Sequence, residues 1–312
     1  MQRIRLIVFP GGFNWPIWVA QARGLFARES LDVEVTHTPG SVYQLSGLIE
    51  QRFDLAITLI DNVIAYRSGQ GEAPLVGRDL CAFMAADTRV LPTLVTQPGI
   101  RRYADLRGRT LSVDALTTGY AFVLLAMLEH GGLTPADYQL ERVGGAEERY
   151  RAMQAGRHAG CLLNSPFERL LEAQGFTLLD HAADALGRYQ GQVLAGRRQW
   201  AEANAQATTG FIRAFLIAVK WLYDPAHQAE AFDIFRRQMP SASNDAPSTA
   251  WRVLFDAELG FPRNGEIDTA ALDTVIELRQ KYGAPPVVLG PARDYYDSAY
   301  LDAARRQLGE VR

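Results

Sequence analysis

The sequence predicts an α/β protein of two lobes, and three observations lead to this fold class. A length of 312 residues suits two domains at roughly 100–200 residues each. Apolar residues make up 48% of the chain and charged residues 21%, which is typical of a globular protein. Segments typical of strands and of helices alternate in two successive series, and the last third of the chain has an almost entirely helical pattern.

The first series contains three expected strands, each followed by a helix. The strands cover residues 4–9, 31–36 and 54–59. Pro16 suits the first turn of the first helix, whose apolar residues recur at the helical spacing. Ser41 and Gln44 resemble a capping box at the start of the second helix, and Asp61 is placed to cap the third.

The second series contains five expected strands, at residues 94–96, 110–113, 139–143, 160–163 and 176–179. Thr117, Thr118 and Gly119 open an apolar helix after the second of these strands, and we expect one threonine hydroxyl to cap it. The segment 134–137 has the cap, the first-turn proline and the acidic residue of another helix start. The expected helices of the last third cover residues 207–223, 227–238, 249–257, 269–282 and 298–308. Because no flexible linker separates the two series, we expect two lobes joined by strands.

Composition and motifs exclude several classes of function. The net charge of −3 gives no general attraction to nucleic acid. No run approaches the ~18 apolar residues of a membrane span, and the apolar part of the first ten residues is too short for an export signal. Cys81 and Cys161 fit no metal or redox motif and are interpreted as buried free thiols. No histidines stand at metal-ligand spacing and no dinucleotide fingerprint occurs, so we expect neither a metal nor a cofactor.

Seven phrases of the sequence resemble one known family. They lie at residues 15–20 with 24–26, 31–35, 51–56, 61–67, 105–113, 153–157 and 199–204. Asp105–Val113 is the most specific of them, whereas Ser30 replaces the glycine that the family usually has before the second phrase. In these phrases the chain resembles the solute-binding proteins of ABC importers. More narrowly, it resembles the branch that binds pyrimidine precursors of thiamine, aliphatic sulfonates, taurine and nitrate.

The resemblance implies a two-lobed type II periplasmic-binding-protein fold. Each lobe would be a mainly parallel sheet flanked by helices, with two crossover strands between the lobes and a helical C-terminal third. Residues 1–90 plus 195–312 would form lobe one, and residues 91–194 lobe two. A small organic molecule, aromatic or carboxylate-bearing, would bind in the cleft between the lobes, which would close by a hinge motion.

The resemblance also implies a transport protein rather than an enzyme. Its partners would be the small-molecule ligand and an ABC permease in the membrane, with no nucleic acid, and we expect a monomer. The expected location is the periplasm, after removal of an export signal that is not present in this chain; the alternative is the cytoplasm.

The candidate ligand-binding residues follow strands and open helices, where sheets and helix N-termini bind ligands. In lobe one they are Phe13, Asn14, Trp15, Ser41, Tyr43, Asp61 and Asn62. In lobe two they are Thr117, Thr118, Gly119, Tyr120, Asn164 and Tyr189, with Phe167 as a further aromatic candidate. The alternatives remain that Asp61 or a threonine only caps its helix and that the aromatic residues only pack. Arg89 and Arg188, near the expected crossovers, are further candidates to pair with a carboxylate.

Two other functions compete with transport. An enzyme on the same fold, similar to pyrimidine synthases, desulfinases or decarboxylase-like proteins, would need a nucleophile such as a cysteine in a loop of lobe one, and none occurs there. A ligand-sensing effector protein would need a separate DNA-binding partner, because no basic helix-turn-helix precedes the first strand. No Gly-x-Ser-x-Gly elbow occurs either.

Overall fold

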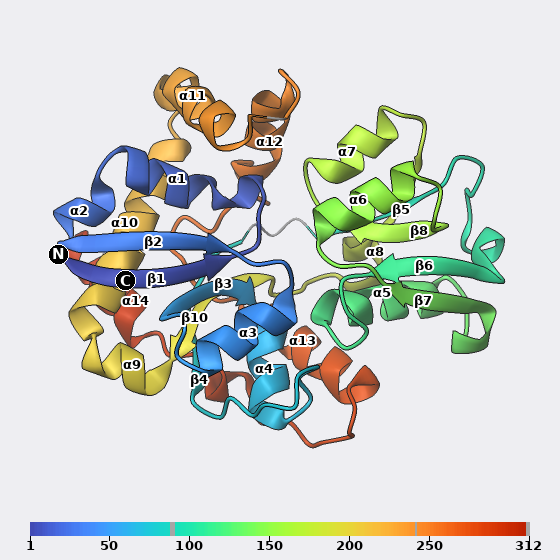
Figure 1. Ribbon diagram of the computed structural model, residues 1–312, viewed down its shortest axis with the longest axis horizontal. Coiled ribbons are helices and arrows are strands. Elements are labelled where there is room, and N and C mark those ends of the chain that lie inside the picture. Colours follow the sequence, from blue (N-terminus) through green and yellow to red (C-terminus); the bar gives the residue numbers. More distant parts are fainter. Residues whose placement is uncertain (88–90, 241, 310–312) are drawn as a thin grey trace.

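Two five-stranded sheets, one in each lobe, organise the chain, as the computed structural model shows (Figure 1). The structure describes residues 1–87, 91–240 and 242–309. Helices flank both sheets, and the chain passes from lobe one to lobe two and back again. The expected two-lobed α/β fold is thereby confirmed.

The first sheet has the strand order β2-β1-β3-β10-β4. Its strands are β1 (Gln2–Val8), β2 (Leu31–His37), β3 (Leu55–Leu59), β4 (Leu80–Ala85) and β10 (Gln192–Arg197). β1 is parallel to both β2 and β3, whereas β10 is antiparallel to β3 and β4. The sheet is therefore mixed, with its parallel part formed by the first three strands of the sequence.

The second sheet has the order β7-β6-β8-β5-β9. Its strands are β5 (Thr93–Thr96), β6 (Arg109–Val113), β7 (Tyr138–Arg142), β8 (Gly160–Leu163) and β9 (Thr177–His181). β6 is parallel to β7 and β8, and β5 is antiparallel to β8 and β9. The parallel strands of both sheets are each followed by a helix, as the alternating pattern predicts.

Helices of the two α/β series cover the sheets, and the last third is helical as expected. The first ten are α1 (Trp15–Ala22), α2 (Leu25–Arg28), α3 (Ser41–Ile49), α4 (Ile60–Ser68), α5 (Gly119–His130), α6 (Ala146–Gln154), α7 (Phe167–Glu172), α8 (Ala182–Leu186), α9 (Arg198–Ala203) and α10 (Ala205–Leu222). The others are α11 (Gln228–Gln238), α12 (Ala246–Leu254), α13 (Thr269–Tyr282) and α14 (Ala299–Gln307). None of the helices in the described ranges is long and apolar enough to cross a membrane.

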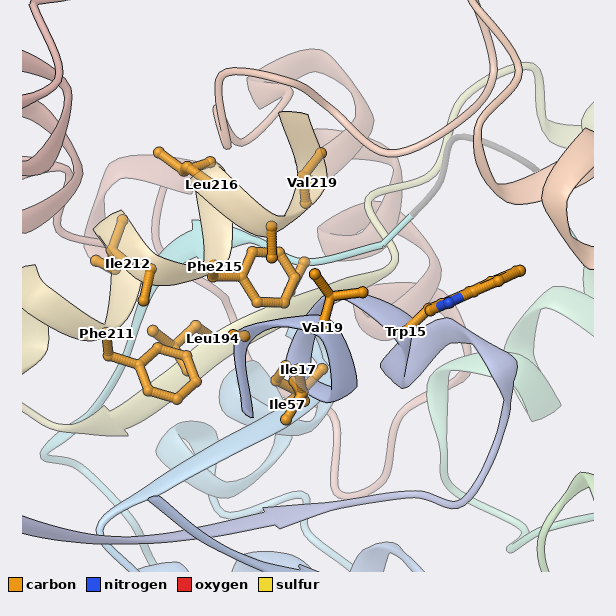
Figure 2. Close-up of a cluster of buried hydrophobic side chains, with 14 of the residues drawn as sticks. Trp15, Ile17, Val19, Ile57, Leu194, Phe211, Ile212, Phe215, Leu216 and Val219 are labelled. Atoms are coloured by element: carbon orange, nitrogen blue, oxygen red, sulfur yellow. The ribbon is translucent and has the colours of Figure 1, made fainter. Parts of the chain in front are cut away.

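The core of lobe one lies between its sheet and α10. Phe211 and Phe215 of α10 pack with Val19 of α1 and with Ile57 and Leu194 of the sheet (Figure 2). A second apolar cluster continues from lobe one into lobe two. It joins Ile64 of α4, Val275 of α13 and Phe122 of α5, because α13 packs against both α4 and α5. The lobes thus share one apolar junction besides the two connecting segments.

One expected domain boundary lies near a connection between the sheets, and the other lies inside a strand. The boundary at residues 90 and 91 adjoins residues 88–90, which lie outside the described ranges together with Arg89. The boundary at 195 falls inside β10, which belongs to the first sheet from Gln192 onwards.

Three predictions of local structure are wrong for identifiable reasons. Gly40, not Ser41, occupies the N-cap of α3, and the side chain of Gln44 donates instead to the backbone carbonyls of Ile7 and Ile57. α4 begins at Ile60, so Asp61 lies in its first turn and is not the cap. The capping box at 134–137 does form, but it holds a single 3₁₀ turn (Pro135–Asp137) that β7 follows directly.

Candidate ligand-binding site

A cavity of about 90 Å³ lies between the lobes, where loops from both sheets meet. Its walls come from the segments that follow β1, β2 and β3 in lobe one and β6, β7 and β8 in lobe two. The lining residues of lobe one are Phe9, Pro10, Phe13, Thr38, Pro39, Leu59, Asn62 and Gln192. Those of lobe two are Asp114, Tyr120, Gly145–Arg149, Asn164, Ser165 and Phe167. The carboxyl ends of the parallel strands therefore converge on one site, as expected for open α/β sheets.

Aromatic side chains form a large part of the walls. Phe9 and Phe13 line the cavity from lobe one, and Tyr120 and Phe167 line it from lobe two. The Tyr120 ring packs against Tyr189 with 6.2 Å between ring centroids. Burial raises the pKa of Tyr120, so its phenol stays protonated at neutral pH. Such walls suit the apolar or flat part of a small molecule.

Several polar groups in the cavity have no partner within the protein. Asn164 Oδ1, Ser165 Oγ and Gln192 Oε1 are buried and form no hydrogen bond within the described part of the chain. Asn62 is held in place, because its Nδ2 donates to Thr58 Oγ1 over 2.9 Å. Buried polar groups are normally satisfied, so these side chains indicate a site for a polar ligand or for ordered water.

Four charged side chains line the cavity, namely Arg149 and Asp114 together with Glu147 and Glu148 of α6. Arg149 of α6 is only 5% exposed, and its side chain makes one long hydrogen bond, from Nε to the Gly145 carbonyl at 3.4 Å. No carboxylate of the described residues lies within ion-pair distance of the Arg149 guanidinium. The Asp114 carboxylate likewise forms no ion pair with a cation of the described residues. Asp114 instead accepts a hydrogen bond of 2.6 Å from the Thr118 hydroxyl.

The N-terminus of α5 is closed by a buried ion pair rather than open to the cavity. Asp61 accepts two hydrogen bonds of 2.5 Å from Nε and Nη2 of Arg279, and both side chains are at most 1% exposed. Nη2 of Arg279 also donates to the Thr117 carbonyl over 2.7 Å, which links α13 to lobe two. The Arg279 guanidinium lies 4.7 Å from the centroid of the Phe122 ring.

Gly119 lets α5 approach this ion pair. A Cβ added at Gly119 would lie 2.7 Å from the Asp61 Cβ and 2.3 Å from the Tyr189 hydroxyl. Only a glycine fits between these groups without displacement. The Tyr189 hydroxyl and Thr117 Oγ1 are buried there without a hydrogen-bond partner in the described chain.

The structure brings most of the sequence-predicted residues to two neighbouring places. Phe13, Asn62, Tyr120 and Asn164 line the cavity. Asp61, Thr117, Gly119 and Tyr189 meet at the junction beside it. Thr118 lies between the two groups, and its hydroxyl donates to Asp114 and to the Ala115 carbonyl instead of capping α5 as expected.

The remaining candidates make contacts elsewhere. Trp15 is buried in the core of lobe one, where its Nε1 donates to the Ala231 carbonyl, and Asn14 Nδ2 donates to the Phe9 carbonyl. Ser41 is buried at the start of α3, while the half-exposed Tyr43 packs under the Arg52 guanidinium. Arg188 lies on the surface, 3.4 Å from Asp268.

Sequence reasoning missed Asp114, Arg149 and Gln192. Asp114 directly follows β6 and could have been found by the rule that selected the threonines after it. Arg149 stands in a run of charged residues, Glu147, Glu148, Arg149 and Arg151, which resembles a solvated helix face. Among the described residues no group of three or more histidine, cysteine, aspartate or glutamate side chains is placed to hold a metal ion.

Two lobes with a cavity between the carboxyl ends of their strands define the class of bilobal α/β binding folds, and comparisons with known proteins place the chain within it. The model of the family described as NMT1/THI5 like matches residues 14–230. The chain therefore belongs to the NMT1/THI5-like family, which confirms the resemblance seen in the sequence. No curated protein matches the chain.

Solved structures share the fold over nearly the whole chain. A protein from Bordetella bronchiseptica RB50 has a TM-score of 0.82 at 17% identity, covering 99% of this chain and 98% of that one. The ligand-binding component of an ABC-type import system from Staphylococcus aureus, solved with zinc bound, has a TM-score of 0.78 at 14% identity, covering 98% and 100%. The alkanesulfonate-binding protein SsuA from Xanthomonas axonopodis pv. citri, bound to MOPS, has a TM-score of 0.74 at 17% identity, covering 96% and 99%.

Proposed function

We propose that this protein is the solute-binding component of an ABC-type importer. It binds a small organic molecule in the interlobe cavity and delivers it to a permease in the membrane. The observation that carries the proposal is a cavity enclosed by both lobes whose buried polar groups lack partners on each side. The shared fold of ABC-import ligand-binding components supports it.

The arrangement of side chains favours binding over catalysis. Within the described chain, neither cysteine nor histidine lines the cavity. Cys81 and Cys161 are buried in β4 and β8, and burial raises their pKa values to about 12 and about 11. Thiols in this state are poor nucleophiles at neutral pH. No side chain that lines the cavity in the described chain favours the alternatives of an enzyme or a ligand-sensing effector.

The proposed mode of action is closure of the lobes on the ligand. Two chain connections and the packing of α5 on α13 leave rotation between the lobes as the accessible motion. Cavity residues from both lobes would contact the ligand in the closed form, so binding would favour closure. In this role the protein works as a periplasmic monomer that docks to its permease.

Native purification followed by mass spectrometry of the released small molecules tests the proposal. We expect one compound to be enriched, to raise the melting temperature when added back, and to reduce the radius of gyration in small-angle scattering. The variant Ala146→Phe fills the cavity from the first residue of α6 and should abolish these effects. Ala270→Phe, exposed in the first turn of α13, is the matched control. Chemical conversion of the bound compound, or binding unaffected by Ala146→Phe, would contradict the proposal.

A further inference from the structure

Arg149 is a buried cation without a counter-ion. Its side chain is nine-tenths buried, and its one hydrogen bond reaches the Gly145 carbonyl from Nε, so neither Nη group has a partner in the described chain. Removing a guanidinium from water costs several kcal/mol unless an anion compensates it. A buried arginine in this state at the wall of the cavity indicates that the ligand supplies the compensating anion.

The acidic neighbours of Arg149 on α6 do not supply this anion. Glu147 and Glu148 also line the cavity, but Glu147 pairs with Arg151, and Glu148 is exposed and lies against Gly144 and Gly145, so neither forms an ion pair with Arg149. Arg149 instead bonds back toward the start of α6, the end of the helix that lines the cavity. Its guanidinium is therefore directed into the site and not onto the helix surface.

Asp114 is the opposite charge in the same cavity. Its carboxylate accepts the Thr118 hydroxyl but pairs with no cation among the described residues. Arg149 and Asp114 both lie close enough to Tyr120 to act on its pKa in opposite directions, yet they form no ion pair with each other. The cavity thus presents a separate donor and a separate acceptor, each charged.

We propose that the bound solute carries an anionic group that Arg149 binds and, on the same molecule, an ammonium or N–H group that Asp114 binds. The apolar middle of such a solute would lie among Phe9, Phe13 and Phe167. Asn164 and Gln192 would complete the hydrogen bonds to either polar group. This inference rests on the proposed function, since it assigns the chemical class of the solute in that site.

Thermal-shift titrations with four sets of small probes test the assignment. The first set, 4-aminobenzoate and β-alanine, carries both groups, and the second, benzoate and propionate, carries the anion alone. Aniline and propylamine carry the amine alone, and methyl benzoate and methyl propionate carry neither an anion nor an N–H group. We expect the first set to stabilise the protein most and the fourth set least, because the fourth leaves both Arg149 and Asp114 unpaired.

Variants connect the effect to the two side chains. Arg149→Gln should weaken binding of the first two sets by about 10- to 100-fold, the value of a hydrogen bond to a charged group. Arg149→Lys should recover part of the affinity, because it keeps the charge and loses the paired donors. Asp114→Asn should weaken the first set and the amine-only set and leave the anion-only set unchanged. Arg151→Gln on the same helix and Asp233→Asn on the surface are the matched controls.

The melting temperature without probe separates a binding role from a structural one. Removing an uncompensated buried charge should leave Arg149→Gln at least as stable as the wild type. Stabilisation by amines or uncharged probes above that by anions, or unchanged anion affinity in Arg149→Gln, would overturn the assignment while leaving solute binding intact. If no set stabilises the wild type and no compound co-purifies with it, the proposed function fails as well.

Discussion

The buried ion pair between Asp61 and Arg279 gives the most direct test of how the lobes are held together. Arg279 is fully buried, makes two hydrogen bonds to Asp61, donates a third to the Thr117 carbonyl in lobe two and a fourth, longer one to Gln70 Oε1. The variant Arg279→Met keeps the apolar part of the side chain against Phe122 and removes all four bonds. It leaves the Asp61 carboxylate buried without a partner.

The expected cost is large because the pair is inaccessible to water. Removing one partner of a buried pair costs about 3–5 kcal/mol, whereas an exposed pair contributes at most about 1 kcal/mol. The exposed pair of Arg236 and Asp233 provides the control through Arg236→Met. The double variant Asp61→Leu with Arg279→Met should recover most of the loss, since it removes both charges.

Urea unfolding followed by two probes measures both the cost and its location. All 5 tryptophans lie in or against the core of lobe one, so their fluorescence reports on that lobe, while circular dichroism reports on both. We expect the two transitions to coincide in the wild type and to separate in Arg279→Met, because the link to lobe two is lost. A loss of stability no greater than that of Arg236→Met, with coincident transitions, would refute this account of the junction.

Three further predictions concern single side chains. Gly119→Ala should lower the free energy of unfolding by about 1–3 kcal/mol, because the added methyl group overpacks the junction. Tyr189→Phe removes the atom nearest to that methyl group and should restore part of the loss. Equal melting temperatures for the single and the double variant would contradict this. Burial raises the pKa of Glu168 from 4.5 to about 7. The folded state therefore binds the proton more tightly than the unfolded state, and stability should fall by up to about 3 kcal/mol as pH rises from 4.5 to 7. The variant Glu168→Gln should not show this fall. A wild-type curve of stability against pH that runs parallel to that of the variant would count against the prediction. Cys81 and Cys161 should react with a thiol reagent only at the rate of unfolding, and rapid labelling of the native protein would show that a thiol is accessible.

The sequence predicts the strands that have a clear pattern, together with the short buried strands β5 and β8, and it misses β4 and β10. β1 and β2 are bounded by turn residues and are followed by helices with apolar residues at helical spacing. Both strands and their positions can therefore be predicted from the sequence. β4 is buried on both faces and β10 on all but its last residue, so neither shows the alternation that marks a half-buried strand. Their short apolar runs were compatible with any buried segment.

The candidate site was predictable only where position along the chain is informative. The rule that ligands meet the loops after parallel strands selected Phe13, Asn62, Tyr120 and Asn164, all of which line the cavity. The rule contains no information on residues inside a helix, and Arg149 is distinguished from Arg151 only by its burial and its lack of a counter-ion in the folded chain.

At the start of α5, residues distant in the sequence take the place that the local sequence pattern predicts for a ligand. A helix N-terminus after a strand attracts an anion, so the sequence favoured Thr117, Thr118 and Gly119 as an anchor. In the structure a carboxylate does lie there, but it is that of Asp61, and Arg279 from the far end of the chain neutralises it. A ligand anion gains nothing at an end that is already occupied and compensated. Among the described residues that line the cavity, the cation without an ion-pair partner is Arg149, on the next helix of lobe two, and the recognition of charge is therefore expected there.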